Sequence, residues 1–91
     1  MVKVELDKVF RKHYKSRISR NKNLVRKYEQ RFEIFLRDRR NLLLKDHKLT
    51  GKLRDKRAFS ITGDIRVVYM EESKDNFVFL DIGTHPQIYG M

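Results

Sequence analysis

The sequence predicts an α+β domain in which an amino-terminal helical hairpin packs on one face of a small, mostly antiparallel sheet. Two observations support this fold class. Apolar residues recur with a period of two at residues 2–6, about every fourth residue over residues 8–36, and with a period of two again beyond residue 57. The resulting order β-α-α-β-β-β, in 91 residues of which 40% are hydrophobic, fits one compact domain over residues 1–91.

The first strand and the first helix are short. Val2–Leu6 alternates apolar and polar residues, which is typical of a strand with one buried face. Asp7 suits the cap of a helix that begins at Lys8, because its carboxylate can accept hydrogen bonds from free backbone N–H groups. The apolar residues of this helix fall four apart on one stripe: Phe10, Tyr14 and Ile18.

The second helix gives the clearest periodicity in the sequence. Residues 19–23 interrupt the first helix and include two asparagines that can cap the next one. The apolar stripe that follows contains Leu24, Val25, Tyr28, Phe32, Phe35 and Leu36. Charged side chains occupy the opposite face, so we expect the two helices to pack together as a hairpin.

The second half of the chain predicts an ordered loop and three strands. The loop is 45–53, which shows neither period and contains Gly51. The strands are 57–62, 65–70 and 76–82. Residues 72–75 form a polar hairpin turn, and Phe77–Leu80 is apolar on both faces, so the last strand should be the most buried. No third layer is predicted, so the sheet face opposite the helices needs polar residues or a bound partner.

The charge of the chain is high and unevenly distributed. The net charge is +10, from 22 Lys and Arg against 12 Asp and Glu. Residues 1–57 carry a net charge of +13, and residues 58–91 carry −3. This pattern favours a polyanionic partner, most often nucleic acid, or an acidic protein; the alternative is that the helix faces are basic only for solubility.

Composition and motifs exclude several classes of function. The absence of cysteine excludes disulfides, thiolate metal sites and cysteine nucleophiles. No apolar run approaches the ~18 residues of a membrane span and no signal peptide follows Met1, so we expect a cytoplasmic protein without a membrane partner. No phosphate-binding glycine loop, zinc-binding His-Glu-x-x-His helix or serine elbow is present, so we expect no cofactor.

The remaining residues suit RNA cleavage without a metal. The 2′-hydroxyl of RNA can attack the adjacent phosphorus, while the protein supplies a general base, a general acid and cationic donors for the phosphate oxygens. His85 is a candidate for proton transfer because an imidazole titrates near neutral pH. Arg66 interrupts the apolar strand 65–70 on the same face as Val68 and Met70, and its planar guanidinium matches two phosphate oxygens.

Structural roles compete with these assignments. Arg66 can form a salt bridge to Asp64 or Asp81, and His85 can be a turn residue whose ring bonds the backbone. His13 lies among basic residues on the first helix and is expected at the surface. The histidines have no nearby carboxylate pair, which is a weak metal signal, and we expect no metal site.

Three segments carry a family resemblance: His47–Leu53, Phe59–Tyr69 and Phe79–Tyr89. They resemble the RelE-like toxins of type II toxin–antitoxin systems, and the YafQ-like branch most nearly. The specific motifs cover residues 45–90, whereas the amino-terminal half agrees only in its strand–helix–helix pattern and basic character. The resemblance implies a ribosome-dependent endoribonuclease that cuts mRNA in the aminoacyl site of a 70S-type ribosome. It also implies a co-expressed antitoxin, which we expect to be acidic, that silences the toxin.

The same resemblance implies roles for individual residues. His85 matches an acid or base, and Arg66 matches the arginine that stabilises the transition state. His47 matches a loop histidine, Asp64 an acidic residue in the turn before the next strand, and Tyr89 an aromatic residue that stacks on or orients the substrate. Basic residues around these positions are the expected RNA contacts: Lys12, Lys15, Lys48, Lys52, Arg54 and Arg57.

The chain also departs from the family pattern, which leaves other functions open. Ser60 stands where YafQ-like members carry another histidine, Ile65 where they carry tryptophan, and Phe59 where RelE itself carries lysine. One alternative is therefore a catalytically inactive module of the same fold that binds RNA or the antitoxin. Another is a ParE-like toxin that inhibits DNA gyrase, although the Gly-Thr-His segment at residues 83–85 argues against it.

Overall fold

A computed structural model describes residues 1–90 and confirms the α+β fold class. The predicted elements are all present, with the following bounds: β1 (Lys3–Leu6), α1 (Lys8–Arg17), α2 (Lys22–Arg37), β3 (Arg57–Ser60), β4 (Ile65–Ser73) and β5 (Asn76–Thr84). Four short elements were not predicted: the 3₁₀ turn η1 (Leu42–Leu44), strand β2 (His47–Lys48), the 3₁₀ turn η2 (Gly51–Leu53) and helix α3 (His85–Tyr89). Among the described helices, none is long and apolar enough to span a membrane.

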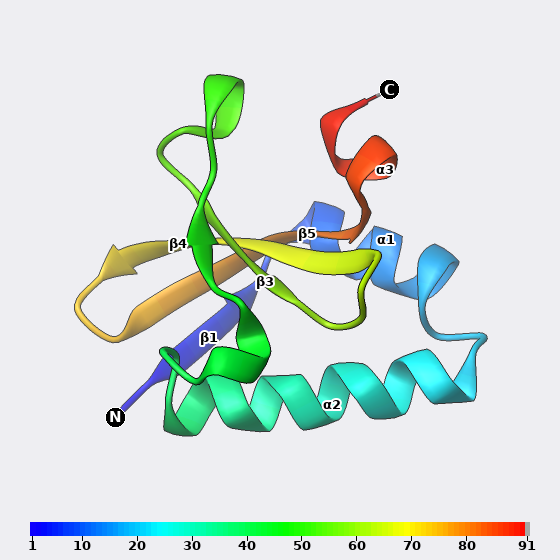
Figure 1. Ribbon diagram of the computed structural model, residues 1–91, viewed down its shortest axis with the longest axis horizontal. Coiled ribbons are helices and arrows are strands. Elements are labelled where there is room, and N and C mark those ends of the chain that lie inside the picture. Colours follow the sequence, from blue (N-terminus) through cyan, green and yellow to red (C-terminus); the bar gives the residue numbers. More distant parts are fainter. Residues whose placement is uncertain (91) are drawn as a thin grey trace.

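The five strands form one mixed sheet in the order β1-β5-β4-β3-β2. β1 runs parallel to β5, and all other neighbours are antiparallel. Figure 1 shows α2 running along one face of this sheet, while α1 lies against β5. The sheet is therefore mostly antiparallel, as the sequence predicts.

Local hydrogen bonds explain where both long helices begin. The Asp7 carboxylate accepts from the Val9 N–H at 3.0 Å, and the Asn21 side chain accepts from the N–H groups of Asn23 and Leu24. Each side chain satisfies donors that have no partner inside the helix. Both predicted caps are confirmed.

The main core lies between the helices and one face of the sheet and is rich in aromatic side chains. Phe35 of α2 is its centre, because its ring lies 5.0–5.2 Å from four rings of the sheet. Those rings belong to Phe59, Tyr69, Phe77 and Phe79. The aromatic residues of α1 and α2 also meet directly, since the rings of Phe10 and Tyr28 lie 6.0 Å apart, which confirms the helical hairpin.

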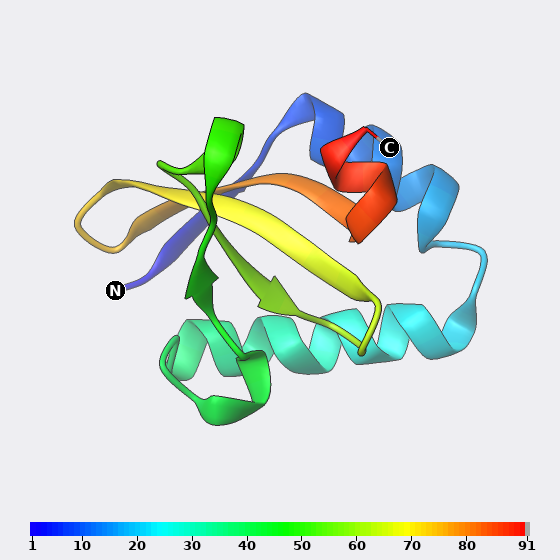
Figure 2. The ribbon, with the colours of Figure 1, turned by 45° about the horizontal axis from the view of Figure 1, so that its top comes forward.

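The prediction that the opposite face of the sheet has no covering layer was wrong in part. Figure 1 shows the green turn η2 and the red helix α3 on the side of the sheet away from α2, and Figure 2 shows the same elements from another angle. Apolar side chains of η2, of α3 and of the neighbouring chain form a second cluster around Ala58 and Val68. It contains Leu49, Leu53, Leu80, Ile88 and Tyr89. We call this side of the sheet the α3 face.

The prediction of a loop over 45–53 was also incomplete. His47 and Lys48 pair with Ala58 and Arg57 and add an edge strand to the sheet. Two residues of strand and five residues of helix are too short to produce a visible period, because a pattern needs several repeats. All four missed elements have two to five residues and therefore escape any argument from periodicity.

Candidate active site

The strand register places Arg66 on the α3 face. Arg66 of β4 lies directly opposite Ser60 of β3 and Gly83 of β5, and directly opposite residues point to the same side of a sheet. Val68 projects to the same side and belongs to the second apolar cluster. The predicted shared face of Arg66 and Val68 is confirmed.

The guanidinium of Arg66 has an unsatisfied donor in a half-buried position. Its Nε atom is fully buried and has no hydrogen-bond partner among residues 1–90. The predicted competing ion pairs, to Asp64 or to Asp81, do not form, and Asp81 is instead bonded to His13 and Arg17. A buried donor without an acceptor costs about 1–3 kcal/mol. The two Nη groups of Arg66 are not buried in this way and form no hydrogen bond with residues 1–90, so they can donate to an anionic ligand. Arg66 is therefore a candidate anion-binding residue.

Helix α3 holds His85 and Tyr89 side by side. Thr84 caps the helix: its N–H donates to Gln87 Oε1 at 2.8 Å, and its hydroxyl accepts from the Gln87 N–H at 3.4 Å. His85 is the first residue of the helix and is exposed, and its ring centroid lies 4.3 Å from that of Tyr89. The imidazole thus packs against the phenol ring at an interplanar angle of 39° and remains open to a ligand.

The turn before β4 brings Asp64 to the same end of the sheet. Ile65 pairs with Thr84 at the carboxyl end of β5, so the preceding Asp64 lies near the start of α3. Asp64 is exposed, and its backbone N–H donates to the Thr62 hydroxyl at 3.2 Å. Four of the five expected catalytic residues therefore come from one end of β4, β5 and α3.

His47 lies on the same face but two strands away. It pairs with Ala58 of β3, which pairs with Val68 of β4. Two strand spacings separate the backbone of His47 from that of Val68, which is about 10 Å. Its ring Nδ1 lies 2.9 Å from the Lys45 carbonyl oxygen, which can only accept, so Nδ1 carries the proton. In the neutral form of the ring, Nε2 is therefore the nitrogen that can accept a proton.

Comparisons with known proteins identify the family. A family model described as "Bacterial toxin of type II toxin-antitoxin system, YafQ" matches residues 2–90. The chain belongs to the YafQ family of type II toxins. No match is found among curated protein sequences.

Solved structures of YafQ-family and related toxins share the fold. YafQ from E. coli strain BL21(DE3) is 21% identical with a TM-score of 0.81, and covers 99% of this chain and 100% of its own. YafQ in the E. coli DinJ–YafQ complex gives 21% identity and a TM-score of 0.80 over 99% of this chain and 100% of its own. A YoeB/ParE toxin from Agrobacterium tumefaciens gives 19% identity and a TM-score of 0.76 over 92% of this chain and 99% of its own.

The basic residues of this YafQ-family toxin fall into two groups. All but one of the residues expected to contact RNA are exposed. The exposed residues are Lys12, Lys15, Lys48, Lys52 and Arg54. Arg57 is half-buried, and its Nε donates to an Asp46 carboxylate oxygen at 2.6 Å. This hydrogen bond raises the pKa of Arg57. Arg57 already has an anionic partner, so its role in RNA binding remains a prediction.

Asp46 is the centre of a polar network that the sequence did not reveal. The Tyr69 hydroxyl donates to Asp46, and Arg39 donates to the Tyr69 oxygen at 3.1 Å. Burial, followed by the hydrogen bond to Asp46, raises the pKa of Tyr69 to about 12. The network joins the end of α2 to β3 and β4, and it lies near the main core rather than on the α3 face.

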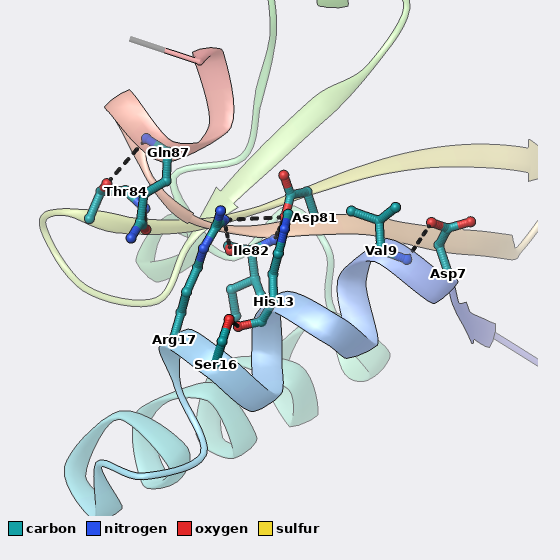
Figure 3. Close-up of polar contacts among 9 residues, drawn as sticks. All are labelled: Asp7, Val9, His13, Ser16, Arg17, Asp81, Ile82, Thr84 and Gln87. Carbon is teal, nitrogen blue, oxygen red and sulfur yellow. Dashed lines mark hydrogen bonds and ion pairs between the residues drawn. The ribbon is translucent and has the colours of Figure 1, made fainter.

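The prediction that His13 is an ordinary surface residue was wrong. Its Nδ1 lies 2.6 Å from Asp81 Oδ1, and only 25% of its side chain is exposed. Figure 3 shows His13 and Arg17 rising from α1 toward Asp81 and Ile82 of β5. The cause is the position of α1 against β5, because the side of the helix next to its apolar stripe then faces the strand. The i, i+4 spacing of His13 and Arg17 was the available signal, but Asp81 lies 68 residues further along the chain than His13.

Proposed function

We propose that this toxin is an endoribonuclease that cleaves mRNA on the ribosome by attack of the RNA's own 2′-hydroxyl. The observation that carries the proposal is the half-buried guanidinium of Arg66, with its unpartnered Nε, on the sheet face that α3 and its His85 cover. A fixed cation with a free donor suits a phosphate whose charge grows during the reaction. His85 supplies the group that moves a proton nearby.

The chemical step balances with side chains alone. The 2′-oxygen bonds to phosphorus, its proton passes to a base, the bond from phosphorus to the 5′-oxygen breaks, and an acid protonates that oxygen. The products are a 2′,3′-cyclic phosphate and a 5′-hydroxyl. His85 performs one of the two proton transfers, and Asp64 or His47 performs the other.

Arg66 and Tyr89 hold the substrate in this mechanism. The guanidinium of Arg66 donates to the non-bridging oxygens and stabilises the charge of the phosphorane. Tyr89 offers an aromatic face on which an unpaired base stacks, which is how single-stranded RNA is usually held. The ring contact of Tyr89 with His85 would then keep the base next to the proton-transfer group.

The charged surface favours RNA as the main partner. Lys52 and Arg54 belong to the turn beside the α3 face, Lys48 of the edge strand β2 projects to the other side of the sheet, and Lys12 and Lys15 project from α1. Such contacts to phosphates are insensitive to sequence and weaken with salt. We assign them to mRNA and ribosomal RNA of a 70S-type ribosome in the cytoplasm. YafQ occurs in complex with DinJ in E. coli, and we propose a corresponding acidic antitoxin for this chain.

The test is inducible expression of the wild type and of His85→Ala, followed by mapping of message 5′ ends, and the same pair in a purified translation system. We expect new 5′ ends only with wild-type toxin and only when ribosomes are present. Loss of one proton-transfer group should lower the cleavage rate about 100- to 10,000-fold. Thermal unfolding of both proteins checks that the exposed substitution leaves the fold intact.

Each contrary result identifies a different function. Equal cutting by His85→Ala overturns the role of His85. Inhibition of DNA supercoiling with intact messages selects a ParE-like activity. Folded protein with neither effect selects the inactive module that the Ser60 and Ile65 departures suggest.

A further inference from the structure

We propose that His13 and Arg17 of α1 are positioning residues. Through hydrogen bonds to Asp81 and Ile82 near the end of β5, they fix α3 and with it the imidazole of His85. This inference rests on the proposed nuclease function for its kinetic readout. It also has a spectroscopic readout that does not require cleavage.

The contacts between α1 and β5 form a cluster of hydrogen bonds around Asp81. His13 Nδ1 lies 2.6 Å from Asp81 Oδ1, and the same oxygen accepts from the Ile82 N–H at 2.8 Å. Arg17 Nη1 donates to the Ile82 carbonyl at 2.9 Å and lies 3.5 Å from Asp81 Oδ1. Figure 3 shows that both α1 side chains converge on this point, one helical turn apart.

The cluster is shielded enough to hold its geometry. The side chains of His13, Arg17 and Asp81 are only 19–25% exposed. Partly buried charges are screened less by water and salt than surface pairs, whose contribution is close to zero. Such polar clusters select one arrangement of the groups that they join, which is the effect needed here.

Gly83 leaves space in which Arg17 of α1 and Gln87 of α3 both approach the backbone of β5. A Cβ atom at Gly83 would lie 2.6 Å from Arg17 Nη1 and 2.7 Å from Gln87 Oε1, so only glycine lets both side chains approach. Gln87 is the residue that completes the capping box with Thr84. Arg17 and Gln87 thus both lie over Gly83, where Arg17 donates to the Ile82 carbonyl and Gln87 accepts from the Thr84 N–H, so the backbone of residues 82–84 links α1 to the first turn of α3.

Helix α3 needs such support because it is short. Five residues cannot form a stable helix alone, so the direction of α3 is set by what it contacts. His85 is the first residue of α3 and directly follows Thr84. A displacement of about 1 Å at a reacting group can lower a rate about 100-fold, so loosening this anchor should lower cleavage without removing any group that touches RNA.

The experiment compares Arg17→Gln with the wild type, both alone and in the His85→Ala background. We expect Arg17→Gln to lower kcat about 10- to 100-fold with little change in KM, and to cost less than 2-fold when His85 is already absent. Equal losses in both backgrounds would mean that Arg17 acts on RNA directly, which overturns the proposal. Arg20→Gln, an exposed charge-matched change in the turn after α1, should leave kcat unaltered.

Nuclear magnetic resonance of the His85 ring separates this inference from the nuclease proposal. We expect Arg17→Gln and Gly83→Ala to shift or broaden the His85 and Tyr89 ring signals while the signals of Phe35 stay in place. Unchanged His85 signals in both variants would overturn the positioning role even if cleavage is confirmed. If no cleavage exists, shifted signals still support the anchor. Should Arg17→Gln fail to fold, His13→Gln, which removes one contact of the same cluster, replaces it in both measurements.

Discussion

The two faces of the sheet differ in what their side chains contact. On the helix-covered face, buried aromatic rings surround Phe35, and Arg39, Tyr69 and Asp46 at its edge are bonded to one another. On the α3 face, the apolar cluster is small and partly exposed, and Arg66 retains a buried donor without a partner. The first face stabilises the fold, although Arg31 Nε of α2 is also buried without a partner, and the second places Arg66 under a thinner apolar cover.

This difference explains how a chain of 91 residues can carry both a core and a site. Small domains have little apolar surface to bury, so groups that cost stability are affordable only where the rest is well packed. An unsatisfied Arg66 contributes nothing to folding. Its cost is offset by the aromatic packing on the other side of the same strands.

The strongest test of the stabilising face is Phe35→Ala. The side chain is 1% exposed and lies at the centre of the aromatic cluster, so its removal leaves a cavity and should lower the free energy of unfolding by about 3–5 kcal/mol. Urea unfolding measures this. The neighbouring Leu36→Ala, on a side chain that is 37% exposed, should cost much less than half as much. Similar losses for the two variants would mean that the core is not centred on Phe35.

The reverse behaviour is expected for Arg66→Met on the α3 face. Methionine keeps much of the length without the buried donor, so the free energy of unfolding should rise by about 1 kcal/mol. Cleavage should fall at least about 100- to 1,000-fold, because the guanidinium that donates to the phosphate is lost together with its charge. Lys74→Met is the matched control, because Lys74 is the other cation of residues 58–91 and lies in the exposed turn between β4 and β5. A variant of Arg66 that is both less stable and fully active would contradict the proposed division between the faces.

The helix-covered face was predictable from the sequence, and the α3 face was predictable only in part. The stripes of α1 and α2 repeat several times, and the caps Asp7 and Asn21 are local, so both signals are contained within short segments. The candidate site residues were predicted mainly from motifs near β4 and β5, and their roles stay predictions. Their shared face follows from the register of the strands, which a single sequence does not specify.

Contacts between distant segments were the features that sequence reasoning missed. His13 was misplaced because its partner Asp81 belongs to the last strand, and the anchoring role of Gly83 depends on side chains from two helices. The network of Asp46 joins residues 11 and 23 positions apart, at Arg57 and Tyr69. Such pairs produce no periodicity, and only the folded chain brings them together.

The pH dependence of the free energy of unfolding tests the hydrogen bond of Tyr69 at the polar edge of the helix-covered face. The pKa of Tyr69 is about 12 in the folded protein against 10.0 in the unfolded chain, because burial disfavours the phenolate. Its stabilising contribution is therefore complete below pH 10 and is lost as the pH rises from 10 to 12. Urea midpoints between pH 8 and 12 should fall more steeply for the wild type than for Tyr69→Phe. Parallel curves would show that the Tyr69 hydroxyl is not held as described.

The smallest expected effects come from the caps of α2 and α3. Removing each cap compares how strongly the helix on each face is coupled to the core. Asn21→Ala removes a cap from the 16-residue α2, which is packed into the main core, so it should lower the global free energy of unfolding by about 1 kcal/mol. Thr84→Ala removes the cap of the five-residue α3, which can fray without opening the core. It should change global stability less, yet increase amide hydrogen exchange over residues 87–90 and lower cleavage by His85. If Thr84→Ala lowers global stability as much as Asn21→Ala does, α3 folds cooperatively with the core and the two faces are not energetically separate.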